Sequence, residues 1–217
     1  MEQIAAILLA AGRSRRMGAF KPLLPFGDTT VIKFCVRQLR GAGLEKIVVV
    51  AGHRADEVRS HLQDFDITFA TNPDPDSAMG VSIARGIEQV SPATQAVVIA
   101  LADYPGVDSS TISLIAGEWQ SGAKLVQPRY EDRGGHPVLI DLSYRDELMI
   151  LDPVKGLRAF FDAHRDQVRR LSVASPYVAR DMDTWEDYVR LHEEIFGRPP
   201  DVDSPDFPRI FGTIGKS

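Results

Sequence analysis

The stretch IAAILLAAGRSRRMGAFKPLLP, residues 4–25, decides the expected fold. It opens with an apolar run of about seven residues, a length that suits a buried parallel strand and is short for a helix. A loop rich in glycine and basic residues follows, at the carboxyl end of that strand, where open α/β sheets bind ligands. Glycines let backbone N–H groups approach an anion closely, and Arg or Lys neutralises its charge. The loop indicates a phosphate site. A basic surface turn stays open as the alternative, because the spacing of the loop matches neither the Walker A nor the GxGxxG pattern.

The composition makes the basic loop a local feature. The chain has 217 residues, 44% of them hydrophobic, and a net charge of −5, so it can bury a full core and has no overall basic field for nucleic acid or an anionic membrane. A single cysteine, Cys35, excludes an intramolecular disulfide and is expected to be a small core residue. The first apolar run is too short for a signal peptide, and no later run approaches a membrane span. A cytoplasmic protein without nucleic-acid or membrane partners is expected.

Strand and helix patterns alternate along the rest of the chain. Such alternation predicts an α/β fold, a three-layer α/β/α sandwich around a Rossmann-like, mostly parallel sheet. One domain over residues 1–196 and a proline-rich tail over residues 197–217 are expected. The expected strands cover residues 4–10, 46–51, 67–70, 96–102, 124–127, 136–140 and 168–173. The expected helices cover residues 31–39, 56–62, 81–90, 109–119, 143–148, 154–164 and 184–196, and residues 129–135 read as a charged loop.

Three acidic residues lie at the ends of predicted strands. Asp103 ends the strand at residues 96–102, and Asp181 and Asp183 precede the last helix. Taken singly, Asp103 reads as a turn former and Asp183 as a helix N-cap paired with Glu186. Combined with a cationic glycine loop they suit Mg²⁺, which proteins hold through few carboxylates together with phosphates and water. The combination suggests phosphoryl or nucleotidyl transfer.

Four collinear motifs carry a family resemblance. They are IAAILLAAGRSRRMGAFKPLLPFGDTTVI, ALADYPGV, GGHPVLI and RDMDTWEDY, and together they span residues 4–188. The set resembles the MobA-like nucleotidyltransferases that act on molybdenum cofactor, and within them the cytidylyltransferases. The resemblance implies the nucleotide-diphospho-sugar transferase type of α/β fold. Three departures are Trp185, where the family usually has proline, Tyr104, where Gln or Met is common, and the helix entry after Asn72, where the family usually has a longer run of serines than MGVSIARG.

The resemblance also implies roles for individual residues. The triphosphate loop would comprise Gly12, Ser14, Arg16, Gly18 and Lys21. The base would lie beside Ala10 and Ala11, and base and ribose would approach Asn72 and Ser82. The metal would be Mg²⁺, on Asp103 and Asp183 with Asp181 nearby. The pterin would face Gly135, His136 and Pro137.

The implied reaction is attack by the terminal phosphate of the pterin cofactor on the α-phosphorus of a nucleoside triphosphate. A phosphate monoester is already anionic, so no protein base is needed. The catalytic residues would be Lys21 and Arg16, which neutralise the charge of the departing pyrophosphate, and Asp103, which holds Mg²⁺. CTP is favoured over GTP because guanylyl-transferring relatives usually have LAGG where this chain has LAAG, so Ala11 stands in place of a glycine. A molybdenum hydroxylase would receive the product. The alternatives are a GTP-using enzyme, a sugar-1-phosphate or other small-metabolite nucleotidyltransferase, and a non-catalytic carrier of the cofactor.

Overall fold

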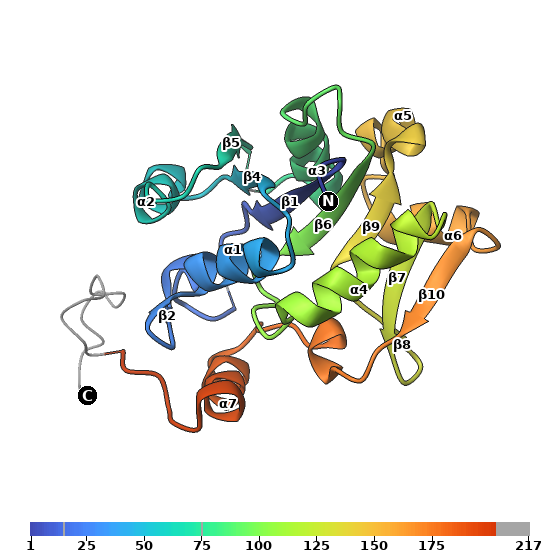
Figure 1. Ribbon diagram of the computed structural model, residues 1–217. Helices are drawn as coiled ribbons and strands as arrows, with labels where there is room; N and C mark the ends of the chain where they lie inside the picture. The colour runs from blue at the N-terminus through green and yellow to red at the C-terminus, as the bar shows by residue number, and fades with distance from the viewer. Residues whose placement is uncertain (15, 75, 203–217) are drawn as a thin grey trace.

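Figure 1 shows the computed structural model, which describes residues 1–14, 16–74 and 76–202. The strands are β1 (Ile4–Ala10), β2 (Pro25–Phe26), β3 (Thr29–Thr30), β4 (Lys46–Ala51), β5 (Thr68–Thr71), β6 (Ala96–Leu101), β7 (Leu125–Tyr130), β8 (Arg133–Gly134), β9 (Val138–Asp141) and β10 (Val168–Ser172). The α-helices are α1 (Val31–Gly41), α2 (Ala55–His61), α3 (Met79–Glu88), α4 (Ser109–Gln120), α5 (Arg145–Met149), α6 (Leu157–Ala163) and α7 (Trp185–Phe196). Three short 3-10 helices are η1 (Lys21–Leu23), η2 (Leu142–Tyr144) and η3 (Pro176–Ala179).

Strand β1 is the centre of the main sheet. The strand order is β10-β7-β9-β6-β1-β4-β5, with β8 paired to β7, and a separate hairpin joins β2 and β3. β1 runs parallel to both neighbours, with Ile7 opposite Val48 of β4 and Ile99 of β6. Every residue of β1 is buried, as expected for a parallel strand covered on both faces.

The two faces of the sheet carry separate hydrophobic cores. Alternate residues of β1 enter each core: Ile4, Ala6 and Leu8 on one face, Ala5 and Ile7 on the other. Helices α1, α2, α4 and α7 supply buried residues to the first core, and α3, α5 and α6 supply the second. Figure 1 shows α1 and α4 lying across one face of the sheet. The three-layer α/β/α sandwich predicted from the sequence is confirmed.

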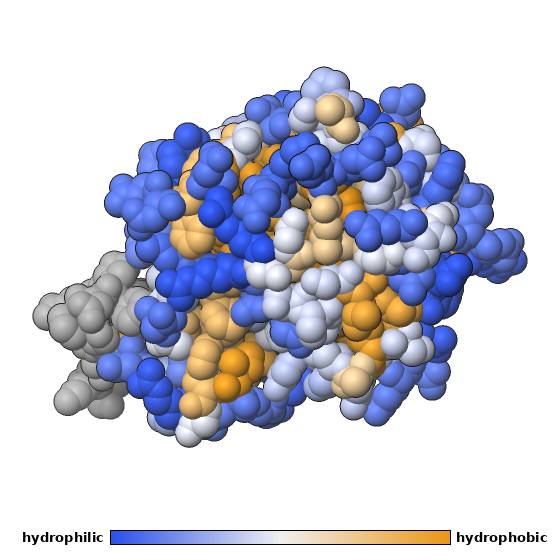
Figure 2. Space-filling model, in the orientation of Figure 1, coloured by the Kyte–Doolittle hydropathy of each residue, from blue (hydrophilic) through white to orange (hydrophobic). Residues whose placement is uncertain are grey.

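The surface over α1 and α4 is mostly hydrophilic. Figure 2 shows this face, on which hydrophobic residues form only separate patches among polar ones. Cys35 of α1 is buried, and burial raises the pKa of its thiol to about 12. It is a core residue, as expected. No helix in the described ranges is long and apolar enough to cross a bilayer.

The sequence pattern misjudged one region of the sheet. Residues 129–135, expected as a loop, instead contain the end of β7 and the whole of β8, which form a hairpin in which Tyr130 pairs with Arg133. Glu131 occupies the left-handed region in this turn (φ 52°), where glycine or asparagine would have marked it in the sequence. β9 also runs antiparallel to β6 and to β7, a direction that hydrophobicity does not encode.

The start of α7 differs from the predicted cap. Thr184 is the N-cap and forms a capping box with Asp187, whose backbone N–H donates to Thr184 Oγ1 at 3.1 Å. The interpretation of Asp183 as a cap paired with Glu186 is therefore wrong by one residue. The correction leaves Asp183 free for other partners. At the other end Gly197 closes the helix in a left-handed conformation (φ 69°), and most of the expected tail, residues 203–217, lies outside the described residues.

Candidate functional site

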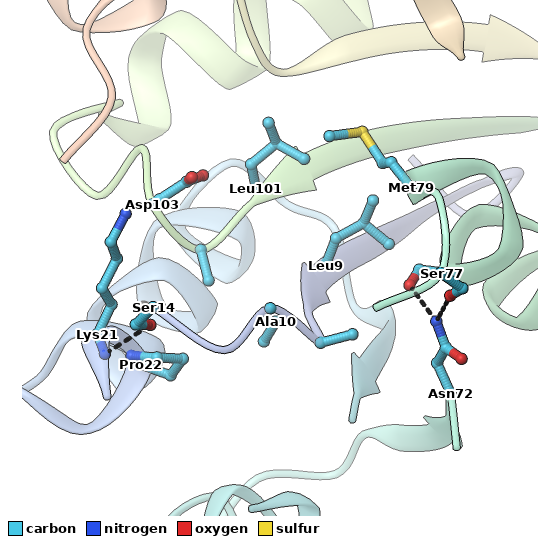
Figure 3. Close-up of a pocket in the computed structure, with 14 residues that line it drawn as sticks. Leu9, Ala10, Ser14, Lys21, Pro22, Asn72, Ser77, Met79, Leu101 and Asp103 are labelled. Atoms are coloured by element: carbon cyan, nitrogen blue, oxygen red, sulfur yellow. Dashed lines mark hydrogen bonds between the residues drawn. The ribbon is translucent and has the colours of Figure 1, made fainter. Parts of the chain in front are cut away.

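A pocket of about 270 Å³ lies at the carboxyl ends of β1 and β6. Leu9 and Leu101, near the carboxyl ends of these strands, line its middle (Figure 3). Lys21 and Asp103 lie at one end of the pocket, and Asn72 lies at the other. The pocket thus has a charged end and an amide end, joined by an apolar floor.

The basic loop forms the charged end. Lys21 is buried, and its backbone N–H donates to Ser14 Oγ at 3.1 Å, which ties the start of η1 back to the loop. Gly12 lines the pocket, and a Cβ built on it would meet no described atom within 4 Å. Gly18 has a left-handed backbone (φ 72°) that favours glycine. An anion could therefore approach the backbone at Gly12 directly.

Two segments far apart in sequence bring carboxylates to the same end. The backbone N–H of Met182 donates to the carbonyl of Asp103 at 2.8 Å, which fixes the segment before α7 against the end of β6. Asp183 then accepts from Lys21 Nζ at 2.7 Å and from Arg16 Nη1. The loop and the acidic segment are joined by these ion pairs.

The environment of Asp103 disfavours its charged form. Burial raises the pKa of Asp103, the positive charge of Lys21 opposes this rise, and the carboxylates of Asp181 and Asp183 add to it. Burial likewise raises the pKa of the neighbouring Tyr104 to about 12, so its hydroxyl stays protonated at neutral pH. A carboxylate held in this way gains from a cation placed beside it.

This donor set fits a divalent cation. Carboxylate oxygens are the ligands that Mg²⁺ and Mn²⁺ prefer, and the mutual repulsion of Asp103, Asp181 and Asp183 would fall if a cation lay between them. Within the described ranges, however, no three acidic, His or Cys side chains are already gathered as ligands. Asp183 is engaged with Lys21 and Arg16, so Asp103 is the carboxylate most available to an ion.

The amide end is built by Asn72, which follows β5. Its Nδ2 donates to Ser77 Oγ and to Ser82 Oγ, each at 2.9 Å, and all three residues line the pocket. Asn72 is 2% exposed, so these hydrogen bonds are sheltered from water. The arrangement locks the loop before α3 against the sheet and presents fixed hydroxyl groups to a ligand.

Ala10 and Ala11 line the pocket between its two ends. Ala11 also packs against Gly52: a Cβ at Gly52 would come within 2.8 Å of the Ala11 carbonyl oxygen and 3.1 Å of its Cβ. The same Cβ would lie 3.0 Å from the carbonyl oxygen of Asn72. Glycine at position 52 therefore allows the ends of β1, β4 and β5 to approach one another.

The segment before β9 lies beside Tyr104, the residue after Asp103, and outside the pocket. A Cβ on Gly135 would stand 1.9 Å from the carbonyl oxygen of Val178, so only glycine fits there. His136 donates its backbone N–H to the same carbonyl at 2.8 Å, and a cis peptide bond joins it to Pro137. Its ring centroid lies 5.5 Å from that of Tyr104, and burial lowers the pKa of His136 to about 4. The imidazole is therefore neutral at physiological pH.

The structure gathers most of the predicted site residues but not all. The predicted residues that line the pocket are Ala10, Ala11, Gly12, Ser14, Lys21, Asn72, Ser82 and Asp103. Arg16 and Asp183 join this group through their ion pairs. Asp181 is exposed and lines a different depression with Arg180 and Arg190.

The sequence analysis missed several lining residues, notably Ser77 and Met79. Both belong to the segment TNPDPDSAMG, for which the sequence predicts only a loop at a strand end. The proximity of that segment to a phosphate loop was a usable signal, because β5 ends at the same edge of the sheet as β1.

One protein family, described as the MobA-like NTP transferase domain, matches residues 6–168, more than half of the chain. Nicotine blue oxidoreductase of Paenarthrobacter nicotinovorans is 28% identical over 199 residues, covering 87% of this chain and 96% of that protein. The bifunctional protein GlmU of Geobacter sulfurreducens is 31% identical over 146 residues. That match covers 64% of this chain and only 30% of GlmU.

Solved structures include a similar protein, Rv0371c from Mycobacterium tuberculosis. It is 34% identical, with a TM-score of 0.75, and the match covers 88% of this chain and 97% of Rv0371c. Rv0371c has also been solved in complex with manganese, in a structure that matches this chain with a TM-score of 0.74. A similar protein has thus been solved with manganese bound.

Proposed function

Because this chain belongs to the MobA-like NTP transferase family, and is a nucleotidyltransferase by that membership, we propose that it transfers CMP from CTP to the phosphate of molybdopterin or molybdenum cofactor. The observation that carries the proposal is the charged end of the pocket. There the open backbone at Gly12 lies beside Lys21, and Asp183 and Asp103 lie opposite. A nucleoside triphosphate needs such a combination of exposed backbone, cations and carboxylates.

The chemistry follows from charge placement. An oxygen of the acceptor phosphate attacks the α-phosphorus of CTP, the bond from that phosphorus to the α–β bridging oxygen breaks, and pyrophosphate leaves. The attacking phosphate is already ionised, so no protein base takes a proton. Lys21 and Arg16 would lie against the leaving pyrophosphate, and the two positive charges would stabilise the negative charge that develops there.

Mg²⁺ held by Asp103 and Asp183 would further neutralise the phosphates when bound. Asp181 would support this ion from outside, through its charge. Lys21 and Arg16 now hold Asp183, and a triphosphate would compete for the same cations. The protein side chains thus exchange one anionic partner for another when the nucleotide binds.

CTP is the proposed donor because of Ala11. Ala11 lines the pocket, and its methyl group would narrow the space for a purine at a position where guanylyl-transferring relatives usually have glycine. Asn72 and the hydroxyl groups of Ser77 and Ser82 would face the base and ribose. We expect Ala11→Gly to admit GTP as a donor.

The test mixes protein, Mg²⁺, molybdenum cofactor and either CTP or GTP, and measures pyrophosphate release. Release from CTP that requires the cofactor supports the proposal, and Lys21→Gln should slow it by about 10²-fold or more. Release with a sugar 1-phosphate in place of the cofactor, or release from GTP alone, would assign another reaction. If no acceptor gives pyrophosphate release, the remaining alternative is a non-catalytic carrier of the cofactor. Pyrophosphate also separates this reaction from the oxidoreduction named for the Paenarthrobacter relative, which produces none.

A further inference from the structure

A second cavity, of about 490 Å³, lies between α6 and the outer strands β7, β9 and β10. Phe161 of α6 and Val138 of β9 give it an apolar side. Arg129 of β7, Arg158 of α6 and Arg170 of β10 also line it, and none of the three was part of the predicted site. The cavity combines space for a ring-sized group with three guanidinium groups.

The strand register explains why the arginines meet. Side chains alternate across a sheet, so Gln127 and Arg129 of β7 face the same side, as does Arg170 of β10. In the parallel pairing Arg170 lies opposite Gln127, one residue pair away from Arg129 on that face. Arg169 points to the opposite face, where its Nη1 donates to Glu118 of α4 at 3.2 Å. The two adjacent arginines of β10 therefore serve different layers of the sandwich.

The cavity carries uncompensated positive charge. Among the described residues, the guanidinium groups of Arg158 and Arg170 have no hydrogen-bonding or ion-pair partner. Arg129 pairs with Asp132 at 2.7 Å, but that carboxylate is fully exposed, and such pairs contribute little. Asp162 is the single carboxylate among the described lining residues. Free guanidinium groups in a concave site bind anions through paired N–H donors.

His136 connects this cavity to the reaction site. It lines the cavity, and its ring lies 5.5 Å from that of Tyr104, the residue next to Asp103. Its Nδ1 is buried without a hydrogen-bond partner in the described part of the chain. β9, which follows His136, pairs Val138 with Ile99 of β6, so the cavity begins at the same sheet edge as the nucleotide pocket. An elongated acceptor could reach from one to the other.

We propose that this cavity, through Arg158 and Arg170, binds a second anionic group of the acceptor, remote from the phosphate that reacts. The inference rests on the proposed function, because it assumes an acceptor whose phosphate reaches the charged end of the pocket. The inference narrows the acceptor to a phosphate monoester that carries a second negative group and a ring-sized body. A sugar phosphate with an uncharged sugar has no second anion for these arginines to bind.

The test compares Arg158→Gln/Arg170→Gln with the matched variant Arg169→Gln, which alters the neighbouring arginine on the opposite face. Rates of pyrophosphate release are measured at varied concentrations of molybdenum cofactor with saturating CTP, and at varied concentrations of CTP with saturating cofactor. The double variant should raise the KM for the cofactor by about 10- to 100-fold, the loss expected for charged hydrogen bonds, and leave the KM for CTP unchanged. Arg169→Gln should behave as wild type. An unchanged KM for the cofactor, or an equal rise with Arg169→Gln, overturns the inference and leaves the proposed function intact.

A wild-type protein that releases no pyrophosphate with this acceptor refutes the proposed function instead. The cavity is then tested alone, with inorganic phosphate titrated by NMR into a Lys21→Gln background that weakens the nucleotide loop. Removing Arg158 and Arg170 should weaken phosphate binding by about 10-fold or more. Equal binding with and without these arginines overturns the anion site.

Discussion

Gly12 offers a test of whether the basic loop is a phosphate cradle or a surface turn. The residue lines the pocket, its backbone is outside the left-handed region, and a Cβ there would meet no described atom within 4 Å. Gly12→Ala should therefore leave the fold intact. It should raise the free energy of unfolding by about 0.4–1 kcal/mol, because alanine reduces the conformational entropy of the unfolded chain.

Nucleotide binding should weaken when a larger side chain replaces Gly12. Gly12→Val would place three carbon atoms in the space through which a phosphate reaches the backbone N–H groups. Each charge-assisted hydrogen bond lost in this way costs about 1.5–3 kcal/mol, so the Kd for CTP should rise by about 10- to 100-fold. Isothermal titration with CTP measures the affinity, and urea unfolding confirms that the variant is folded.

Gly117→Ala is the matched control. Gly117 lies in α4, a Cβ there would also meet no described atom within 4 Å, and the position is remote from the pocket. The control should gain stability, by about 0.5–1 kcal/mol from helix propensity, and bind CTP as wild type does. If Gly12→Val is folded and binds CTP with wild-type affinity, the loop does not bind phosphate through this backbone, and the interpretation as a basic surface turn is supported instead.

Three further substitutions test the site and its supports. Burial raises the pKa of Asp103, so the folded state binds its proton more tightly than the unfolded state does, and stability falls as pH rises from the ordinary carboxyl pKa to the raised value. In urea unfolding without divalent metal, Asp103→Asn should therefore be more stable than wild type at neutral pH and lose this advantage in acid; an advantage that does not change with pH would contradict the assignment. Asn72→Ala removes the donor to two serine hydroxyls and should lower the free energy of unfolding by about 1–3 kcal/mol, with an unchanged value arguing against a role in fixing the loop. Gly135→Ala would press a Cβ against the Val178 carbonyl oxygen at 1.9 Å and should cost about 1–3 kcal/mol, so a wild-type melting temperature would show that this segment can shift freely.

The central part of the fold could be predicted from local sequence because the signals there agree. β1 is an uninterrupted apolar run, and its flanking strands β4 and β6 have the same character, so burial on both faces is legible in the residue types. The strand directions in the outer half of the sheet were harder to predict from the residue types. β9 is as apolar as a parallel strand, and its reversed direction depends on the hairpin between β7 and β8, whose turn residue Glu131 carries no glycine signal.

The site residues divide in the same way. Gly12 and Lys21 lie in one continuous motif, so the sequence could place them together. The position of Asp183 depends on a hydrogen bond between Met182 and Asp103, and on the choice of Thr184 as the helix cap, neither of which spacing alone can decide. Arg158 and Arg170 are exposed basic residues of ordinary appearance. They form a common surface only through the register of β10 on β7 and the placement of α6.

The charge balance at the reaction site bears on how a nucleotide can enter it. The charged end of the pocket has, among its described residues, the two cations Lys21 and Arg16 and the two carboxylates Asp103 and Asp183, so the formal charges of these four groups cancel. A free triphosphate would gain the two cations, but it would then lie against Asp103 and against Asp183, whose ion pairs with those cations it had broken. Such repulsion in a partly buried site is expensive. A triphosphate that arrives with its own divalent cation satisfies both sets of charges, because the phosphates meet Lys21 and Arg16 while the cation meets the carboxylates. We therefore expect a metal–nucleotide complex to bind better than a free nucleotide, and such a complex would replace the ion pairs that Lys21 and Arg16 make with Asp183.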